Sequence, residues 1–242
     1  MISKNQIKLI TSLQQKKYRQ LHQLFIAEGV KVIQELLESN FELEHLYITE
    51  PIFNNCKKDV KTTITSSEMD RISCLKTPTN SLALFKINDI PPLEEKGLIV
   101  ALDDIRDPGN LGTIIRLCDW FGIEQLWCSQ ETVDVYNPKV VQVTMGSISR
   151  VNVNYLDLAT KLKSIKLPIF GTFMEGENIY KSILPSEGII ILGNEANGIS
   201  NALEKIIQKK ITVPRFGSIQ KTESLNVATA AAIVLSEFKR IS

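Results

Sequence analysis

The sequence predicts an α/β protein with two modules, a small α/β module followed by a larger one built on a parallel sheet. Short apolar runs of the kind found in buried strands alternate with helical stretches along the chain, which favours parallel strands joined by helices. Pro91 and Pro92 interrupt this alternation within a polar stretch, and consecutive prolines break helices and strands alike. We therefore predict a linker at residues 91–97, a first domain at residues 1–90 and a second at residues 98–242.

In the first domain, Ile7, Ile10 and Leu13 recur at helical spacing. An apolar stripe over residues 30–37 predicts an amphipathic helix, which follows a strand-like run at residues 24–27. Further strands are expected at residues 45–49, 62–65 and 82–86, and a helix start at residues 66–68. Together these elements predict a small α/β sandwich.

The second domain opens with a continuous apolar run at residues 98–102, typical of a buried parallel strand. A Pro-Gly turn at residues 107–110 leads into a helix at residues 111–122, which Gly122 ends. Further strands are expected at residues 126–128, 151–155, 168–173, 188–193 and 210–213, and a last helix at residues 224–240. Because strands alternate with helical stretches, we expect a parallel sheet covered on both faces.

Composition places the chain among ordinary globular proteins, since 43% of its 242 residues are hydrophobic and 23% are charged. Wholesale disorder is excluded on this ground. No apolar run approaches the roughly 20 residues that cross a bilayer, and residues 1–21 lack the apolar core of a secretory signal. We therefore expect a cytoplasmic protein without a membrane partner.

Histidine and cysteine limit the chemistry available to the larger domain. The two histidines are His22 and His45, so residues 91–242 contain none. This excludes a histidine base, a Ser-His-Asp triad and a His-Glu-x-x-His zinc site there, and we expect no bound metal. The four cysteines show no Cys-x-x-Cys spacing and are expected to be reduced, mostly buried thiols.

Charge is unevenly distributed, although the net charge is only +1. Residues 1–27 contain basic side chains and no acidic one, and a basic face suits a polyanion such as nucleic acid. Lys16, Lys17 and Arg19 are the candidate nucleic-acid contacts in this stretch. The alternative is a solvated helix face whose charge bias is accidental.

Open parallel sheets bind ligands beyond the carboxyl ends of their strands, and three polar segments follow predicted strands in the second domain. The first runs from Asp103 to Arg116 and places a Pro-Gly turn before a helix, whose free N–H groups attract anions. Asn110 and Arg116 are its candidate site residues. The alternative is that Asn110 only caps the helix and Arg116 only forms an ion pair.

The second segment is Gly-Asn-Glu-Ala-Asn-Gly at residues 193–198, directly after a buried strand. It matches neither the dinucleotide fingerprint nor the phosphate-binding loop. Glu195 is either a functional carboxylate or one that stabilises a helix terminus. The third segment follows the strand at residues 210–213 and continues to Ser224, a suitable N-cap for an alanine-rich helix.

In their order along the chain, the three segments resemble motifs 1, 2 and 3 of the SpoU (TrmH-like) RNA 2′-O-ribose methyltransferases, which belong to the SPOUT superfamily. The matching patterns are Asn-x-Gly-x-x-x-Arg from Asn110, Leu-Gly-Asn-Glu-x-x-Gly from Leu192, and Val-Pro from Val213 followed by Ser-Leu-Asn-Val-Ala from Ser224. The resemblance covers roughly residues 98–240. The Phe-Ile-Ala-Glu-Gly run at residues 25–29 is similar to a signature of the family's N-terminal domain.

This resemblance implies a SPOUT-type parallel sheet with a C-terminal trefoil knot, preceded by a small L30e-like domain that binds the RNA substrate. It also implies S-adenosylmethionine as the cofactor and a homodimer formed through the knotted domain, with an active site that combines two subunits. The cofactor contacts carried over from the family are Thr172, Leu192, Gly193, Val213, Ser224, Leu225 and Asn226.

The reaction implied by the resemblance is methyl transfer to a ribose 2′-hydroxyl, with Arg116 as the central catalytic residue and Asn110 and Glu195 ordering the site. Arg116 is either a general base or a stabiliser of the developing alkoxide. A guanidinium with a pKa above about 12 fits the second role better. Lys139 and Arg150 are candidate RNA contacts, with ordinary surface charge as the alternative.

Ribosomal RNA is the expected substrate, because family members that act on transfer RNA are more often single domains with short basic tails. Transfer RNA is the first alternative. Another is a non-catalytic RNA-binding or ribosome-assembly protein of the same fold, which would be free to lose Asn110, Arg116, Glu195 and Asn226, all present here. The last is methylation of a base, against which the first and third motifs argue together.

Overall fold

A computed structural model of the chain describes residues 1–90, 92–219 and 224–240. Pro91, the first residue of the predicted linker, lies outside these ranges. The chain forms two compact units, one of Met1–Asp89 with Asp134–Ser149 and the other of Ile90–Val133 with Arg150–Ser242. The chain therefore passes from one unit to the other three times.

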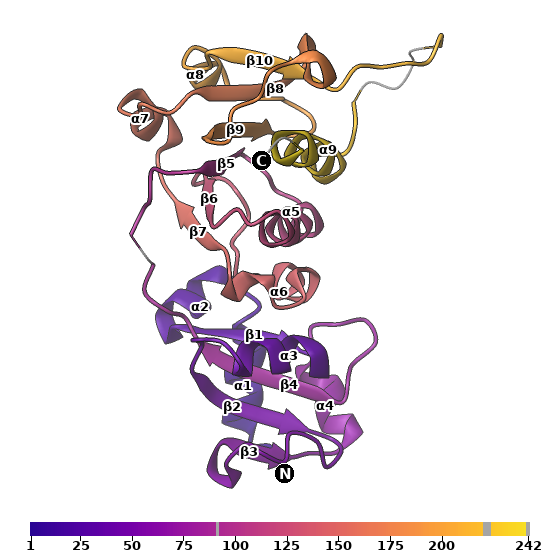
Figure 1. Cartoon of the computed structure of the whole chain (residues 1–242). Coiled ribbons are helices and arrows are strands. Elements are labelled where there is room, and N and C mark those ends of the chain that lie inside the picture. Colours follow the sequence, from indigo (N-terminus) through magenta and orange to yellow (C-terminus); the bar gives the residue numbers. More distant parts are fainter. Residues whose placement is uncertain (91, 220–223, 241–242) are drawn as a thin grey trace. The chain divides into compact units, whose positions relative to one another are not determined.

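The first unit is built on a four-stranded sheet with the order β1-β4-β2-β3 (Figure 1). β4 pairs antiparallel with both β1 and β2, and β3 pairs parallel with β2. The strands are β1 (Leu24–Glu28), β2 (Leu43–Ile48), β3 (Lys61–Thr63) and β4 (Ser81–Lys86). Each overlaps a strand that the apolar runs predict.

Helices cover this sheet, and two of them share a core with it. Ile10 of α1 and Met69 of α4 are buried in one apolar cluster with Leu84 of β4. α3 is the predicted amphipathic helix and contacts β1 and β4. The helices are α1 (Lys4–Ser12), α2 (Lys16–His22), α3 (Val30–Leu37), α4 (Ser66–Ile72) and the 3₁₀ helix η1 (Lys58–Val60). α2 and η1 were not predicted, because their few residues are mostly polar.

A segment that lies between β6 and β7 in the sequence packs in the first unit. It contains α6 (Pro138–Thr144) and the 3₁₀ helix η2 (Ser147–Ser149). The ring of Tyr136 lies 4.8 Å from that of Phe25, measured between centroids. Gly146 has a φ of +98°, and a Cβ at this position would meet the Cβ of Glu35 at 2.4 Å. Only glycine permits both the backbone conformation and this close approach.

The second unit is built on a six-stranded sheet with the order β10-β8-β9-β5-β6-β7, and every neighbouring pair is parallel. Its strands are β5 (Leu98–Asp103), β6 (Gln125–Cys128), β7 (Asn152–Tyr155), β8 (Ile169–Asn178), β9 (Gly188–Gly193) and β10 (Lys209–Thr212). The predicted parallel sheet is confirmed. The strand order reverses between β5 and β9, where open parallel sheets bind their ligands.

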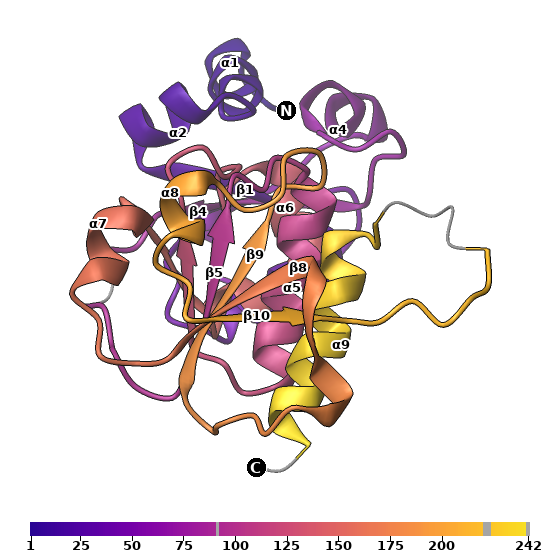
Figure 2. The same cartoon turned by 90° about the horizontal axis from the view of Figure 1, so that it is seen from above.

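Helices lie on both faces of this sheet, as predicted (Figure 2). α5 packs against α9 on one face, where the ring of Phe238 lies 5.1 Å from that of Phe170 between centroids. On the other face, Leu162 of α7 and Leu203 of α8 share a buried cluster with Trp127. The helices are α5 (Pro108–Trp120), α7 (Leu158–Lys163), α8 (Asn201–Glu204), α9 (Val227–Lys239) and the 3₁₀ helix η3 (Ile179–Lys181).

Two helix starts differ from the predicted ones. α5 begins at Pro108, and its N-cap is Asp107, whose Oδ1 accepts a hydrogen bond from the N–H of Asn110 at 2.9 Å. α9 begins at Val227, and its N-cap is Asn226 rather than Ser224. Asp and Asn are both strong N-caps, so local capping decides each start. Asn110 is consequently left with a side chain that has no capping role.

The trefoil knot stays a prediction, because the order of the strands does not establish how the chain threads.

Among the described residues, no helix combines the length and the apolar character needed to cross a membrane.

Candidate active site

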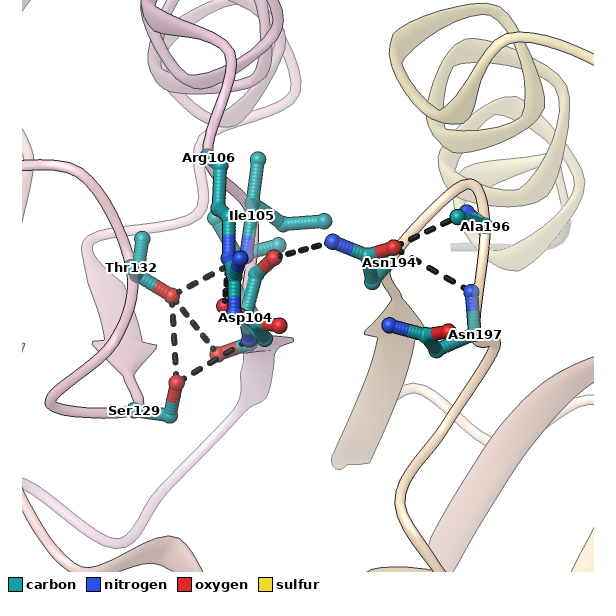
Figure 3. Close-up of polar contacts among 9 residues, drawn as sticks. Asp104, Ile105, Arg106, Ser129, Thr132, Asn194, Ala196 and Asn197 are labelled. Atoms are coloured by element: carbon teal, nitrogen blue, oxygen red, sulfur yellow. Dashed lines mark hydrogen bonds and ion pairs between the residues drawn. The ribbon is translucent and has the colours of Figure 1, made fainter.

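Hydrogen bonds join the carboxyl end of β5 to the segment that follows β9. The Oδ2 of Asp103 accepts a hydrogen bond from the N–H of Ser200 at 2.7 Å. The Nδ2 of Asn194 donates to the carbonyl of Asp104 at 2.7 Å (Figure 3). The first and second polar segments therefore lie together at the reversal of strand order.

Asn110 connects all three polar segments. Its Nδ2 donates to the Oε1 of Glu195 in the second segment, and its Oδ1 accepts a hydrogen bond from the Nδ2 of Asn226 in the third, at 2.8 Å. The two bonds use opposite ends of one carboxamide, so they fix which way it faces. The structure thus brings Asn110, Glu195 and Asn226 into one hydrogen-bonded chain.

Asn226 is itself fixed by the helix that it caps. Its Oδ1 accepts hydrogen bonds from the N–H groups of Ala228 and Thr229, at 3.0 and 3.2 Å. With the oxygen held by the first turn of α9, the Nδ2 group is turned toward Asn110. Helix capping and the orientation of the site side chain are therefore two effects of one residue.

A cavity of about 960 Å³ lies beside these hydrogen-bonded side chains, and Glu195 lines it. A volume of this size is at the upper end of the range typical of small-molecule sites. Six of the seven predicted cofactor contacts line it; the seventh, Asn226, and the catalytic candidates Asn110 and Arg116 do not. The six are Thr172, Leu192, Gly193, Val213, Ser224 and Leu225.

One wall of the cavity comes from an irregularity in β8 that the sequence analysis missed. β10 pairs with β8 through Lys210 and Gly171, and its next residue, Ile211, pairs with Glu177. The intervening part of β8 leaves the ladder, and the wall residues Phe173, Met174 and Glu175 come from it. No local pattern signals this jump, because apolar and polar residues follow one another there as in any half-buried strand.

Glycine is required where the second segment turns. A Cβ on Gly193 would meet the carbonyl carbon of Gly198 at 2.4 Å, which is closer than any real side chain can come. The loop closes through two backbone hydrogen bonds between Asn194 and Gly198, at 2.8 and 3.1 Å. Glycine at 193 therefore lets the loop close on itself at the cavity wall.

The third segment supplies apolar surface to the cavity. Val213, Phe216 and Ile219 line it, and Phe216 is 83% exposed, with its ring 6.3 Å from that of Tyr180 between centroids. Apolar walls combined with exposed backbone groups suit a ligand that carries both an aromatic ring and polar atoms. The residues present fit the adenosyl and amino acid parts of S-adenosylmethionine.

Arg116 lies on α5 with an exposed side chain and outside the cavity wall. Within the described ranges, no hydrogen bond or ion pair engages its guanidinium. The surface ion pair that was the alternative for Arg116 is thus not formed with any described residue. It is also not joined to the chain formed by Asn110, Glu195 and Asn226 in a single copy of the protein.

The predicted RNA contacts differ in how far their side chains are exposed to solvent. Lys16, Lys17 and Lys139 are exposed. Arg19 is only 2% exposed: it forms an ion pair with Asp134, and its NH1 donates to the carbonyls of residues 13 and 14 at 2.8 and 2.9 Å. The prediction that Arg19 contacts RNA is corrected on this ground, because its guanidinium is committed to the protein interior.

Arg150 is also engaged, although at the surface. Its Nε donates to Asp119 at 3.0 Å, and its side chain remains 46% exposed. An exposed ion pair of this kind contributes little to stability.

The cysteine thiols offer no nucleophile near the site. All four cysteines are free, and two of them, Cys118 and Cys128, are buried. Burial raises the pKa of the Cys118 thiol to about 12 and raises that of Cys128 as well. Both thiols are consequently protonated at neutral pH. In the part of the chain that the structure describes, no group of three His, Cys, Asp or Glu residues is placed to hold a metal ion.

Comparison with known proteins finds family models that match both parts of the chain. The family model of the SpoU rRNA Methylase family matches residues 97–236, and that of the MRM3-like substrate binding domain matches residues 4–83. The 23S rRNA (guanosine(2553)-2′-O)-methyltransferase RlmP of Bacillus subtilis is 29% identical over 96% of both chains.

Two solved structures resemble the whole chain. One, from Porphyromonas gingivalis, is assigned to the TrmH family of RNA methyltransferases; it is 37% identical over 100% of both chains, with a TM-score of 0.91. The other is an AdoMet-bound rRNA methyltransferase from Sinorhizobium meliloti, 25% identical over 100% of this chain and 97% of that one, with a TM-score of 0.88.

Proposed function

The chain belongs to the SpoU rRNA methylase family, and from this premise we propose that it transfers the methyl group of S-adenosylmethionine to a ribose 2′-hydroxyl of ribosomal RNA. The observation that carries the proposal is the link from Glu195 through Asn110 to Asn226, beside a cavity lined by six of the seven predicted cofactor contacts. RlmP, which aligns along nearly the whole chain, is named for the same reaction on 23S rRNA.

The cavity residues hold the cofactor through shape and backbone. Gly193 lets the loop that forms one wall close tightly on Gly198, while Val213 and Leu225 contribute apolar wall. S-adenosylmethionine supplies a methyl group on a sulfonium that is already a good leaving group. The protein therefore mainly has to align the hydroxyl and manage its proton.

The hydrogen-bonded side chains of Glu195, Asn110 and Asn226 are suited to positioning the ribose. Asn110 is held at both ends of its carboxamide, so Glu195 is held in turn, with a second carboxylate oxygen that can accept from a ribose hydroxyl. Arg116 is permanently charged and exposed. We assign it to stabilise the developing alkoxide and to hold a neighbouring phosphate.

A second copy of the chain completes the site in this proposal. Arg116 does not line the cavity of its own copy. Trp120, one turn further along α5, is 84% exposed, and exposed aromatic residues of this size are common at protein interfaces. A homodimer through the second unit would cover Trp120 and bring Arg116 of one copy to the cavity of the other.

The first unit is proposed to hold the RNA, in keeping with its match to a substrate-binding domain. Lys16 and Lys17 on α2 and Lys139 on α6 are exposed cations in this unit, and such cations bind phosphate without reading sequence. The reaction then takes place in the cytoplasm, where bacterial ribosomal RNA is made.

The test is methyl transfer from labelled S-adenosylmethionine to ribosomal RNA from a strain that lacks the gene, with the product mapped by ribose-methylation sequencing. We expect one 2′-O-methyl nucleotide that is absent from the deletion strain and restored by the purified protein. Transfer to tRNA alone would favour the alternative substrate. Tight cofactor binding without transfer to either RNA would overturn the proposed activity.

A further inference from the structure

Asp104, the residue directly after β5, has an unusual backbone conformation. Its φ is +58°, in the left-handed region. Aspartate tolerates this region better than most residues, but the conformation still has to be held by its surroundings. The turn that follows β5 leads to Asn110, so whatever holds Asp104 also sets the direction in which the chain enters the site.

Two buried hydroxyls hold this turn (Figure 3). The Oγ of Ser129 accepts a hydrogen bond from the N–H of Asp104 at 3.0 Å, and the Oγ1 of Thr132 accepts one from the N–H of Ile105 at 3.3 Å. Ser129 is 7% exposed and Thr132 is 2% exposed. Both follow β6 and lie outside the three polar segments that mark the active site.

Ser129 also reaches the residue before the turn, because its N–H donates to the carbonyl of Leu102 at 2.9 Å, whereas Thr132 spans the turn with its hydroxyl alone. Besides the N–H of Ile105 after the left-handed residue, its hydroxyl contacts the carbonyl of Leu102 before it, at 3.3 Å. The N–H of Val133 adds a bond to the carbonyl of Ile105 at 2.9 Å. One side chain thereby fixes both sides of Asp104.

The carbonyl of Asp104 reaches the second segment. It accepts the hydrogen bond from the Nδ2 of Asn194 at 2.7 Å, while the Oδ1 of Asn194 accepts from the N–H groups of Ala196 and Asn197 at 2.8 and 3.2 Å. The carboxamide of Asn194 therefore joins the end of β5 to the two residues that follow Glu195. Glu195 itself bonds Asn110.

From this chain of contacts we infer that Thr132 is a positioning residue for Glu195, acting through the backbone of Asp104 and the side chain of Asn194. The inference rests on the proposed methyl transfer for its effect on rate. Loss of the Thr132 hydroxyl removes its contacts with Ile105 and Leu102 but leaves the bonds from Ser129 and Val133 in place. The turn after β5 is thereby loosened rather than freed, and with it the bond from Asn194 to Asp104 and the loop that carries Glu195. A misplacement of this kind slows the aligned reaction more than it weakens binding.

Thr132→Val tests this with little change of shape, and Thr132→Ser is the conservative variant that keeps the hydroxyl. We expect kcat to fall by about tenfold in Thr132→Val, with KM for RNA and Kd for S-adenosylmethionine within about threefold of wild type. Thr132→Ser should recover most of the rate. Thr144→Val is the matched control, because Thr144 is also fully buried and its hydroxyl bonds, among the residues that the structure describes, only the carbonyl of Val141 in α6.

Asn194→Asp is a second variant that does not depend on how Thr132→Val folds. It keeps the oxygen that accepts from Ala196 and Asn197 but loses the donor to Asp104. We expect it to reproduce the loss of kcat. Wild-type rates in both Thr132→Val and Asn194→Asp would overturn the inference.

Amide hydrogen exchange supplies a readout that needs no activity. In Thr132→Val, peptides covering residues 194–198 should exchange faster by about tenfold, while peptides from β9 keep wild-type protection. Unchanged exchange in residues 194–198 would overturn the link from Thr132 to the loop, whatever the rates. If no RNA is methylated even by the wild-type protein, the proposed function fails, and the exchange result still decides whether the link exists.

Discussion

Asn226 donates a hydrogen bond to the Oδ1 of Asn110 at 2.8 Å, across 116 residues of sequence. The donor is the N-cap of the last helix, and the acceptor lies in the first turn of α5, the helix that packs against it. The packing of two helices thus sets the geometry of a polar group that also holds Glu195. Substitutions of Asn226 can therefore distinguish its effect on stability, through helix capping, from its effect on the rate of methyl transfer.

Asn226→Asp should keep the protein stable and remove most of its activity. An aspartate at this position still caps α9 through its Oδ1, so we expect the melting temperature to stay near that of wild type. The donor to Asn110 is lost, and the rate of methyl transfer should fall by about 100-fold. Asn137→Asp is the control, because Asn137 caps α6 in the same way, accepting from Lys139 at 2.9 Å. Full activity in Asn226→Asp would show that the bond to Asn110 is not needed.

Arg116→Ala should abolish methyl transfer while leaving cofactor binding within severalfold of wild type. The guanidinium is exposed and lies outside the cavity wall, so its removal should change the free energy of unfolding by less than about 0.5 kcal/mol. Calorimetry with S-adenosylmethionine and single-turnover transfer measure the two effects separately. Arg71→Ala, at an exposed position on α4, is the control for loss of one surface charge. Near-normal turnover in Arg116→Ala would refute the role assigned to it.

Mixing two inactive variants tests whether the site is shared between copies. If Arg116 of one copy serves the cavity of the other, a heterodimer of Arg116→Ala with Glu195→Ala contains one intact site. Random pairing of equal amounts should then restore about a quarter of the wild-type rate. The control is each variant mixed with itself. Absence of any recovery, with subunit exchange verified by mass spectrometry, would place each Arg116 in its own copy's site.

Trp120→Glu should convert the protein to a monomer. The indole is 84% exposed on α5, so the substitution costs little in the isolated chain, whereas a charge buried at an interface is expensive. Sedimentation velocity at several concentrations gives the mass, and circular dichroism verifies the fold. Ile183→Glu, at a position 90% exposed, is the matched control. A wild-type protein that sediments as a monomer would contradict the proposed homodimer directly.

Much of the second unit could be predicted because buried parallel strands are continuous apolar runs. Residues 98–102 and 188–193 were placed within one residue of β5 and β9. Their polar continuations were expected at the same edge of the sheet, and Asn194 does meet the carbonyl of Asp104 there. Strand type and direction are thus local properties of the sequence, and the convergence of loops follows from them.

What could not be predicted depends on contacts between distant residues. The pairing of β10 with β8 jumps in register between Lys210 and Ile211 of β10, and the residues of β8 that it skips form a cavity wall without any local signal. Arg19 belongs to the basic N-terminal stretch, but its side chain is buried and forms an ion pair with Asp134, more than a hundred residues away in the sequence. The helices α2, α7 and α8 are too short and polar for an apolar stripe to reveal them.

A carboxylate buried in the first unit makes stability depend on pH in a direction opposite to that of most acids. Glu28 is 3% exposed. It accepts hydrogen bonds from the Oγ of Ser73 and the N–H of Cys74, both at 2.6 Å. Burial raises the pKa of this carboxyl, and the two hydrogen bonds oppose the rise only in part. The folded state therefore retains a proton at pH values where the unfolded chain has lost it.

The stability that Glu28 contributes is therefore fully present below the unfolded pKa, about 4.3 for glutamate, and is lost as pH rises through the higher folded pKa. Glu28→Gln cannot ionise, so the variant should gain stability relative to wild type over that rise, measured by urea unfolding with circular dichroism. Glu68→Gln is the control of opposite sign, because hydrogen bonds from the N–H groups of Thr65 and Ile2 lower the pKa of Glu68. It should lose stability relative to wild type as pH rises through the lowered pKa. The difference in free energy of unfolding between wild type and Glu28→Gln should thus change with pH. If it does not, Glu28 ionises as readily in the folded chain as in the unfolded one.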